Sequence, residues 1–415
     1  MIPVAQAEAI ILRHVQPLDP ERDREVVPLE AAGERILAQA VASERDFPAW
    51  DNSAMDGYAV RAADVATARA TQPVNLTVAA EIPAGQPSSQ TLQAGQAARI
   101  FTGAVMPAGA DAVVMQEEAE RDGATVQIRA APEVGQFVRR QGAFCSAGQT
   151  LLPPGIRLGP AELAVLATAQ CTRLSVFRPL QVALLSTGDE LVTPEQTLQP
   201  GQIVDSNRYA LAAAVARTGA QPRSLGIVPD EPERLRQAMA EAIHQADIVL
   251  STGGVSVGDY DFVSQTLQDL GGTIHLRQVA IKPGKPLTFA TIPRPAGPCL
   301  YFGLPGNPAS ALVTYYRFVQ PALRQRSGLA APWGPEFLTA RSRHDLRADG
   351  RRETYLWGQL QLVAGGYEFA LAPGPHLSGN VIGLAQTTGF AIVPPGQGAI
   401  AAGEAVQVMA LDRGY

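Results

Sequence analysis

The central fold is indicated by two similar stretches, residues 181–190 (QVALLSTGDE) and residues 246–254 (ADIVLSTGG). Each is a short apolar run, as in a buried strand, and each ends in a polar turn that contains glycine. Helical patterns at 206–220, 232–246 and 261–272 alternate with these strands and with strands at 224–230 and 299–306. This alternation predicts an α/β domain over 178–326, a parallel sheet with helices on both faces.

The rest of the chain divides into three further parts. Residues 1–45 and 160–171 have helical patterns, whereas 46–145 alternate short β-type runs (VNLTVAA, DAVVMQ, TVQIRA) with Gly/Pro turns. We therefore expect a helical linker domain, 1–45 with 146–177, into which a small β domain, 46–145, is inserted. Residues 327–415 are β-rich and predict a C-terminal β domain. The predicted fold class is multidomain α+β around the central α/β domain.

Composition excludes several classes of protein. The 415 residues carry 33 Lys+Arg against 39 Asp+Glu, a net charge of -6, which argues against a broad basic surface for nucleic acid. Three scattered cysteines, Cys145, Cys171 and Cys299, exclude a disulfide framework and a cysteine-based zinc site. Neither a leader pattern nor an apolar run of ~18 residues occurs. We expect a cytoplasmic protein without membrane or nucleic-acid partners.

The two lysines are unusual. Only Lys282 and Lys285 are lysine among the 33 basic residues, which leaves 33 - 2 = 31 arginines. Every other basic position is arginine, and both lysines lie within IKPGKP. This pattern indicates that compact ammonium groups are needed at these two positions.

Four polar segments follow predicted strands: residues 186–190, 251–258, 282–286 and 305–310. Ligands of open α/β sheets bind beyond the carboxyl ends of the strands. Glycines such as Gly253 and Gly254 allow close backbone approach, and free amides with two ammonium groups attract an anion. Each segment alone is also consistent with an ordinary turn, and Asn307-Pro308 with a helix start. The four together predict an anion site, although neither a Walker A nor a dinucleotide-binding motif occurs.

Carboxylates lie near the same segments. The acidic candidates are Asp51, Asp56, Glu190, Asp230, Asp259 and Asp261. Carboxylates that face a phosphate site typically hold Mg²⁺, although turn or capping roles remain open for Asp51 and Asp230. The five histidines are scattered without a zinc motif, and no GxSxG nucleophile elbow is present.

Seven ordered motifs match one family: DNSAMDGYAVR, RIFTGAVMPAGADAVVMQE, VALLSTGDEL, IVDSN, STGGVSVGDYDF, IKPGKPLTF and GLPGNPAS. Together they resemble the molybdopterin molybdenumtransferase family, also called MoeA, which is similar to the E domain of gephyrin. The resemblance extends from the first helix to the C-terminal β region. It implies insertion of molybdenum from molybdate into adenylylated molybdopterin, with Mg²⁺-dependent hydrolysis of the adenylate and release of AMP. It also implies a homodimer with its active site between subunits. A molybdopterin adenylyltransferase is expected to supply the substrate.

The resemblance also assigns roles to residues. It implies functional roles for Asp56, Thr102, Glu190, Asp261, Lys282 and Lys285, and a metal or nucleotide role for Asp230, Asp261 and Glu190. Lys282, Lys285, Pro286 and Ser310 match the molybdate pocket, which Arg352 and Ser378 complete. The glycine loop with Gly253, Gly254 and Ser256, together with Asn307, is expected to bind the remaining substrate.

The chain departs from the family pattern after RRQG, where Ala143-Phe144-Cys145 replaces an acidic pair, and at Trp357, where the family has an arginine. Two alternative functions stay open from the sequence. One is a molybdopterin adenylyltransferase, which would not require DNSAMDG or either β domain. The other is a non-catalytic molybdopterin carrier or scaffold, for which the lost acidic pair is the support. Molybdenum or tungsten preference and the recipient apo-enzymes are not encoded in any motif.

Overall fold

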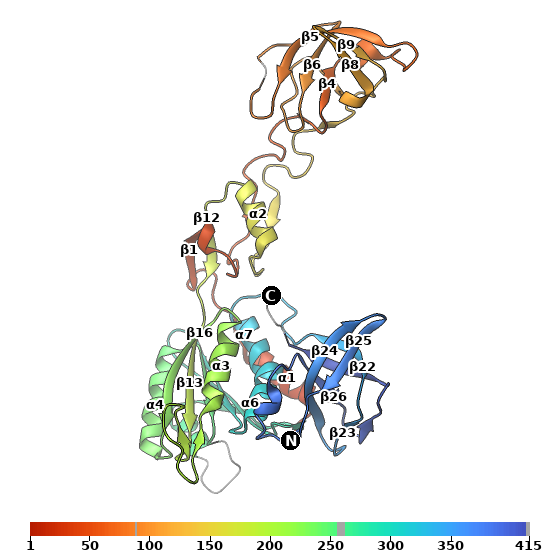
Figure 1. Cartoon of the computed structure of the whole chain (residues 1–415). Helices are drawn as coiled ribbons and strands as arrows, with labels where there is room; N and C mark the ends of the chain where they lie inside the picture. The colour runs from red at the N-terminus through yellow and green to blue at the C-terminus, as the bar shows by residue number, and fades with distance from the viewer. Residues whose placement is uncertain (88, 255–261, 412–415) are drawn as a thin grey trace. The chain divides into compact units, whose positions relative to one another are not determined.

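The computed structural model describes residues 1–87, 89–254 and 262–411 (Figure 1). The chain folds into two compact units. Unit 1 comprises Met1–Gln39, Pro154–Pro160 and Arg173–Tyr415, and unit 2 comprises Ala40–Pro153 and Ala161–Thr172. The four-domain division expected from the sequence is finer than these two units and stays a prediction.

A six-stranded sheet forms the centre of unit 1. Its order is β16 (Gln221–Val228), β13 (Gln181–Thr187), β17 (Ile248–Thr252), β21 (Cys299–Leu304), β20 (Pro286–Ile292) and β18 (Thr273–Gln278). The first four strands are parallel, as predicted, but β20 is antiparallel to both its neighbours. The expectation of a wholly parallel sheet is therefore corrected. The physical reason is that no crossover helix separates β18 from β20, and a short connection permits only antiparallel pairing.

Helices cover both faces of this sheet, as predicted. Leu184 and Leu250 point into a core with α3 (Ser206–Ala216) and α6 (Pro308–Thr314). Their chain neighbours Leu185 and Val249 point into a second core with α4 (Pro232–Gln245) and α5 (Phe262–Asp269). Alternate side chains of a strand face opposite sides, so both faces bury apolar surface. Helix α1 (Val4–His14) packs into the first core (Figure 1).

The helical linker predicted for 1–45 and 146–177 is helical only at α1 and at α2 (Pro160–Thr168). The intervening segments form β1 (Arg24–Pro28), which pairs with β12 (Arg173–Phe177), and β2 (Val41–Ala42), which pairs with β11 (Thr150–Leu152). Leu37, within the segment expected to be helical, makes a β-bridge to Val176. Pairing between segments distant in sequence thus overrides the local helical spacing.

Unit 2 contains a second six-stranded sheet. Its order is β7 (Ala112–Met115), β4 (Gly57–Val60), β6 (Gln96–Ile100), β5 (Val74–Ile82), β9 (Thr125–Ile128) and β8 (Ala119–Asp122). The three predicted β runs correspond to β5, β7 and β9. Short strands β3 (Asn52–Ser53) and β10 (Val138–Arg139) pair beside it. The β character of the inserted region is confirmed.

The C-terminal part of unit 1 contains a third sheet, as predicted. Strands β24 (Glu353–Val363), β25 (Gly366–Leu371), β22 (Phe337–Ser342), β28 (Ala405–Ala410) and β26 (Gly389–Val393) pair in that order, and β26 pairs back onto β24. The two-residue strand β19 (Ile281–Lys282) joins β24. It thereby ties the connection between β18 and β20 to the C-terminal sheet.

The remaining elements are short. They are β14 (Leu191–Val192), β15 (Ile203–Val204), β23 (Leu346–Arg347), β27 (Ala399–Ile400), α7 (Gln320–Arg326), the π-helical turn η4 (Tyr315–Val319) and the 3₁₀ turns η1 (Leu29–Ala31), η2 (Ala62–Val65), η3 (Gln116–Glu118) and η5 (Ile382–Leu384). Among the helices of the described ranges, none has both the length and the apolar character needed to span a bilayer.

Candidate functional site

Three loops meet at the carboxyl edge of the α/β sheet. Gly253 and Gly254 follow β17 with φ of +87° and +65°, a conformation that favours glycine. A Cβ on Gly253 would lie 2.2 Å from the Thr187 carbonyl oxygen at the end of β13, and one on Gly306, after β21, would lie 3.7 Å from the Gly253 Cα. The Thr187 hydroxyl is buried and has no hydrogen-bond partner within the described residues. The glycines thus hold neighbouring backbones close at the edge where a ligand would bind.

Carboxylates gather at one end of this edge. The Asp230 amide, just beyond β16, donates to Asp189 Oδ1 at 3.1 Å. Partial desolvation and then the carboxylates of Asp189 and Glu190 raise the pKa of Asp230 above its ordinary value. The electrostatic part of this shift reflects the closeness of the Asp189 and Glu190 carboxylates to that of Asp230. Glu190 and Asp230, predicted as metal ligands, are therefore brought together, with Asp189 added to the set.

The start of α6 contacts the C-terminal part of the unit. Asn307 occupies the N-cap position without a capping hydrogen bond, and Pro308 begins the helix. The Asn307 amide instead donates to Ser378 Oγ at 3.1 Å, and the Ala309 amide donates to the Ser378 carbonyl at 3.0 Å. Ser310 is buried in the first turn of the helix. Asn307, Ser310 and Ser378, all predicted site residues, therefore lie within one small region.

The loop that carries the two lysines, residues 282–286, packs against the same helix, α6. Gly284 has φ of +112°, and a Cβ there would lie 2.6 Å from Thr314 Cγ2 and 3.6 Å from the Ser310 carbonyl oxygen. Pro286 begins β20 directly after this loop. Within the described ranges, the Lys285 ammonium has no ion-pair partner. The backbone of the loop that carries Lys282 and Lys285 therefore packs against α6 at Gly284.

Pairing of β19 with β24 brings further charged side chains to Lys282. Lys282 lies opposite Thr354, and the Arg352 guanidinium donates to the Ile281 carbonyl at 3.4 Å. The Lys282 Nζ lies 3.1 Å from Asp349 Oδ2, and Arg352 Nη2 lies 3.6 Å from the same oxygen. Lys282 and Arg352 thus converge on a single acceptor.

Asp56 and Thr102 meet in unit 2. Asp56 Oδ1 accepts hydrogen bonds from the Thr102 amide and the Thr102 hydroxyl, both at 2.7 Å. These bonds, the amide first, hold the pKa of Asp56 below its ordinary value, and Arg99 adds a smaller effect. Asp56 therefore stays ionised at neutral pH. Asp51, the other carboxylate of this motif, pairs with Arg140 at 2.6 Å and accepts from the Gln141 amide, which fits the turn role left open for it.

The predicted residues are not all described, and those that are described fall in both units. Ser256, Asp259 and Asp261 lie outside the described residues. Asp51, Asp56 and Thr102 belong to unit 2, whereas the other described candidates belong to unit 1. Phe144, at the departure from the family pattern, is 71% exposed. Within the described part of the chain, no three His, Cys, Asp or Glu side chains are arranged to hold a metal ion.

Two acidic residues were not singled out from the sequence. They are Asp349, which pairs with Lys282, and Asp189, which lies beside Asp230. Asp189 is part of the quoted STGDE turn, so its position after a strand was an available signal. Asp349 carried none, because its contact with Lys282 joins residues 67 positions apart. Asn207, at the start of α3, donates to the Gly306 carbonyl at 2.6 Å, while Asp205 caps α3 by accepting from the Arg208 amide.

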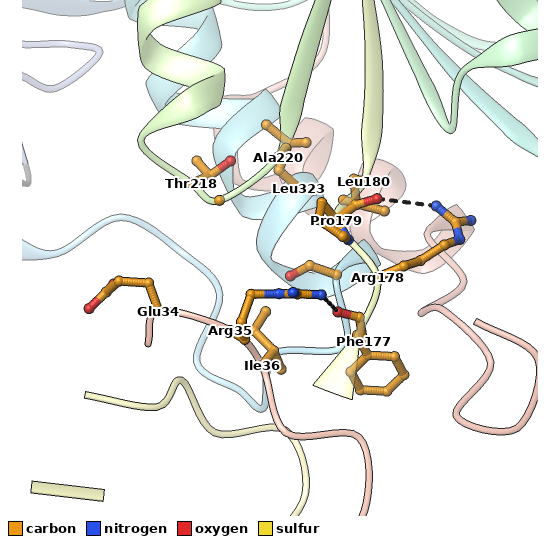
Figure 2. A pocket seen from close by; sticks show the side chains of 12 residues that line it. Glu34, Arg35, Ile36, Phe177, Arg178, Pro179, Leu180, Thr218, Ala220 and Leu323 are labelled. Carbon is orange, nitrogen blue, oxygen red and sulfur yellow. Dashed lines mark hydrogen bonds between the residues drawn. The ribbon is translucent and has the colours of Figure 1, made fainter. Parts of the chain in front are cut away.

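A small cavity of about 100 Å³ lies at the opposite, amino-terminal edge of the sheet (Figure 2). Its lining includes Phe177, Leu180 and Ala220, and its cations already have partners. Arg35 donates to the Phe177 carbonyl at 2.8 Å and pairs with Glu25, and Arg178 pairs with Asp23 and Asp247. This cavity therefore lacks the free cations of an anion site.

Family models match almost the whole chain. The matching descriptions are "MoeA N-terminal region (domain I and II)" over residues 2–169, "Probable molybdopterin binding domain" over 183–325 and "MoeA C-terminal region (domain IV)" over 339–411. The matched ranges include every described candidate residue discussed above.

Individual proteins match over nearly their full length. The molybdopterin molybdenumtransferase of Nostoc sp. is 56% identical over 402 residues, covering 97% of this chain and 92% of the relative. That of Haemophilus influenzae is 35% identical and covers 92% and 93%. Two crystal structures of a molybdopterin biosynthesis MoeA protein from Pyrococcus horikoshii align over 99% of this chain and 99% and 100% of theirs, with TM-scores of 0.81 and 0.84 at 31% and 26% identity.

Proposed function

Because this chain belongs to the molybdopterin molybdenumtransferase (MoeA) family, enzymes of molybdenum cofactor biosynthesis, we propose how it inserts molybdenum into molybdopterin. The proposed substrates are molybdate and adenylylated molybdopterin. Metal insertion is accompanied by Mg²⁺-dependent hydrolysis of the adenylate and release of AMP. The observation that carries the proposal is the convergence of Lys282 and Arg352 on one carboxylate oxygen, next to the pairing of β19 with β24.

This convergence suits a tetrahedral dianion. Ammonium and guanidinium groups form short, charge-assisted hydrogen bonds to oxyanions. Lys282 and Arg352 already share one oxygen acceptor, and Lys285 is free of ion pairs within the described residues. We assign molybdate to these three cations, with Ser310 and Pro286 completing the pocket. Positioning of molybdate next to the pterin dithiolene then supplies much of the acceleration.

The adenylylated pterin is assigned to the glycine loop and the start of α6. Gly253 and Gly254 bring the backbone close to any ligand at the sheet edge, and the buried Thr187 hydroxyl offers an unused donor. Asn307 and Ser378 add polar contacts at the boundary with the C-terminal sheet. Together these groups bind and orient the substrate, so that no side chain has to act as a covalent nucleophile.

The residues present fit Mg²⁺ in their chemistry. The carboxylates of Asp189, Glu190 and Asp230 lie close enough to repel one another, and a hard cation with oxygen ligands would offset that repulsion. Glu190 and Asp230, with Asp261, would hold the ion. When bound, Mg²⁺ neutralises charge on phosphate oxygens.

Further proposals rest on family membership. We propose that the protein acts in the cytoplasm as a homodimer and that Asp56 and Thr102 of one subunit serve an active site shared with the other. A molybdopterin adenylyltransferase would supply the substrate. The exposed Phe144, in place of a family carboxylate, would then have a peripheral role.

The test is AMP release from adenylylated molybdopterin with Mg²⁺, with and without molybdate. We expect molybdate-dependent release by the wild-type protein and its loss in Lys282→Ala/Lys285→Ala. The matched control is Lys282→Arg/Lys285→Arg, which keeps the charge but replaces a compact ammonium by a planar group. We expect the arginine variant to bind molybdate but to turn over slowly.

The same assay separates the two alternatives. A carrier would bind the substrate tightly without releasing AMP in either condition. An adenylyltransferase would consume ATP with molybdopterin and would be indifferent to molybdate. Either result would overturn the proposal.

A further inference from the structure

Asp349 occupies a special position in the proposed molybdate pocket. A single oxygen, Asp349 Oδ2, lies 3.1 Å from Lys282 Nζ and 3.6 Å from Arg352 Nη2. These are the two cations whose convergence carries the proposed function. An oxyanion oxygen that bridged Lys282 and Arg352 would have to use the same N–H groups that now face Asp349 Oδ2.

We infer that Asp349 is an internal counterion that competes with molybdate for Lys282 and Arg352 and so sets the affinity of the site. This inference rests on the proposed function. It concerns a residue to which neither the motifs nor the family resemblance gave a role.

The pairing of strands explains why a counterion is needed. Pairing of β19 with β24 brings Lys282 near Arg352, which directly precedes β24 and donates to the Ile281 carbonyl. Two like charges brought this close repel each other. Asp349 offsets this repulsion while the site holds no anion. A dianion can take over the role when it binds.

The charge balance favours replacement by a dianion. Lys282, Lys285 and Arg352 carry +3 together, and Asp349 reduces this to 3 - 1 = +2. A dianion offers more charge to the shared donors than one carboxylate does, whereas a monoanion offers no more. The carboxylate therefore weakens the binding of every anion but leaves a dianion able to displace it.

The local backbone allows the carboxylate to move aside. Asp349 lies between β23 and β24 and is followed by Gly350, with φ of +71°. Its other oxygen, Oδ1, accepts from the Arg351 amide at 3.1 Å. The side chain is about one-third exposed, at 32%. Displacement of Oδ2 therefore breaks exposed ion pairs and leaves the core intact.

The test compares Asp349→Asn with the wild-type protein. Asparagine keeps an oxygen that can accept from the Arg351 amide but loses the charge. We expect the molybdate concentration for half-maximal AMP release, and the dissociation constant from direct binding of molybdate to the protein alone, to fall about threefold to tenfold. The difference should shrink when the salt concentration is raised.

Asp345→Asn is the matched control. Asp345 lies four residues earlier, and its carboxylate accepts from the Ala402 amide outside the pocket, so both constants should stay at the wild-type value. Unchanged constants in Asp349→Asn, or a weaker affinity for molybdate, would overturn the inference. Absence of molybdate-dependent AMP release in the wild-type protein would instead refute the proposed function.

Discussion

A buried hydrogen-bond chain connects three elements of unit 1, and one conservative substitution tests it. Arg317, in the π-helical turn η4, pairs with Glu8 of α1 through two bonds of 2.6 and 3.0 Å. Its Nε donates to the Tyr355 hydroxyl at 3.1 Å, and that hydroxyl donates to Glu353 Oε1 at 2.6 Å. Tyr355 is fully buried in β24, two residues after the β19 pairing begins at Glu353. Tyr355→Phe removes both hydroxyl bonds without creating a cavity.

The expected loss of stability follows from these contacts. Each removed bond has a charged partner, and such bonds contribute about 1.5–3 kcal/mol each, so two amount to about 3–6 kcal/mol. Glu353 is only partly buried, so water replaces part of its bond. Arg317 is almost fully buried and keeps an unsatisfied donor. We therefore expect a loss of about 2–4 kcal/mol in the free energy of unfolding.

The assay is hydrogen exchange of peptides that cover β24, measured as the urea concentration is raised, because global unfolding of a chain with two units need not be two-state. The matched control is Tyr367→Phe, in the neighbouring strand β25, where the side chain is 37% exposed. This control should stay within about 0.5 kcal/mol of the wild-type protein. A loss below about 0.5 kcal/mol in Tyr355→Phe would show that the two hydroxyl bonds do not stabilise β24.

Three further predictions follow from other parts of the chain. Thr102→Val removes the hydroxyl bond to Asp56 and should raise the depressed pKa of Asp56 toward its ordinary value. The contribution of this bond to stability is present above the ordinary pKa and is lost as the pH falls through the folded-state pKa. An NMR titration that shows the same Asp56 pKa in the variant would contradict the prediction. Gly57→Ala should destabilise unit 2 by about 1–3 kcal/mol, since the new Cβ would lie 1.9 Å from the Val114 carbonyl oxygen, and an unchanged urea midpoint would show that the strands can move apart. Burial raises the pKa of Cys299 to about 12, so alkylation at neutral pH should require unfolding, and rapid modification of the native protein, seen by mass spectrometry, would exclude this environment.

Local patterns predicted much of the α/β fold. The apolar runs at 181–187 and 248–252 are buried strands, and their glycine turns meet at one edge, because carboxyl ends of parallel strands share an edge. The antiparallel direction of β20 could not be predicted in the same way. It depends on the length of a connection rather than on any periodicity.

The sequence offered candidate site residues one by one, but not the contacts among them. Lys282 was identified by its rarity, yet its neighbours Asp349 and Arg352 are brought to it only by the pairing of β19 with β24. Asn307 similarly meets Ser378 across 71 positions of sequence. Such contacts depend on register between distant strands and loops, which local propensity does not encode.

The most direct test of the central claim is the molybdenum content of the pterin product. Wild-type protein would be incubated with adenylylated molybdopterin, Mg²⁺ and molybdate, and the released pterin separated and analysed for molybdenum and AMP together. We expect one molybdenum per AMP released, with both lost in Lys282→Ala/Lys285→Ala. Release of AMP with a metal-free pterin would contradict it, because the protein would then be a hydrolase that does not transfer the metal.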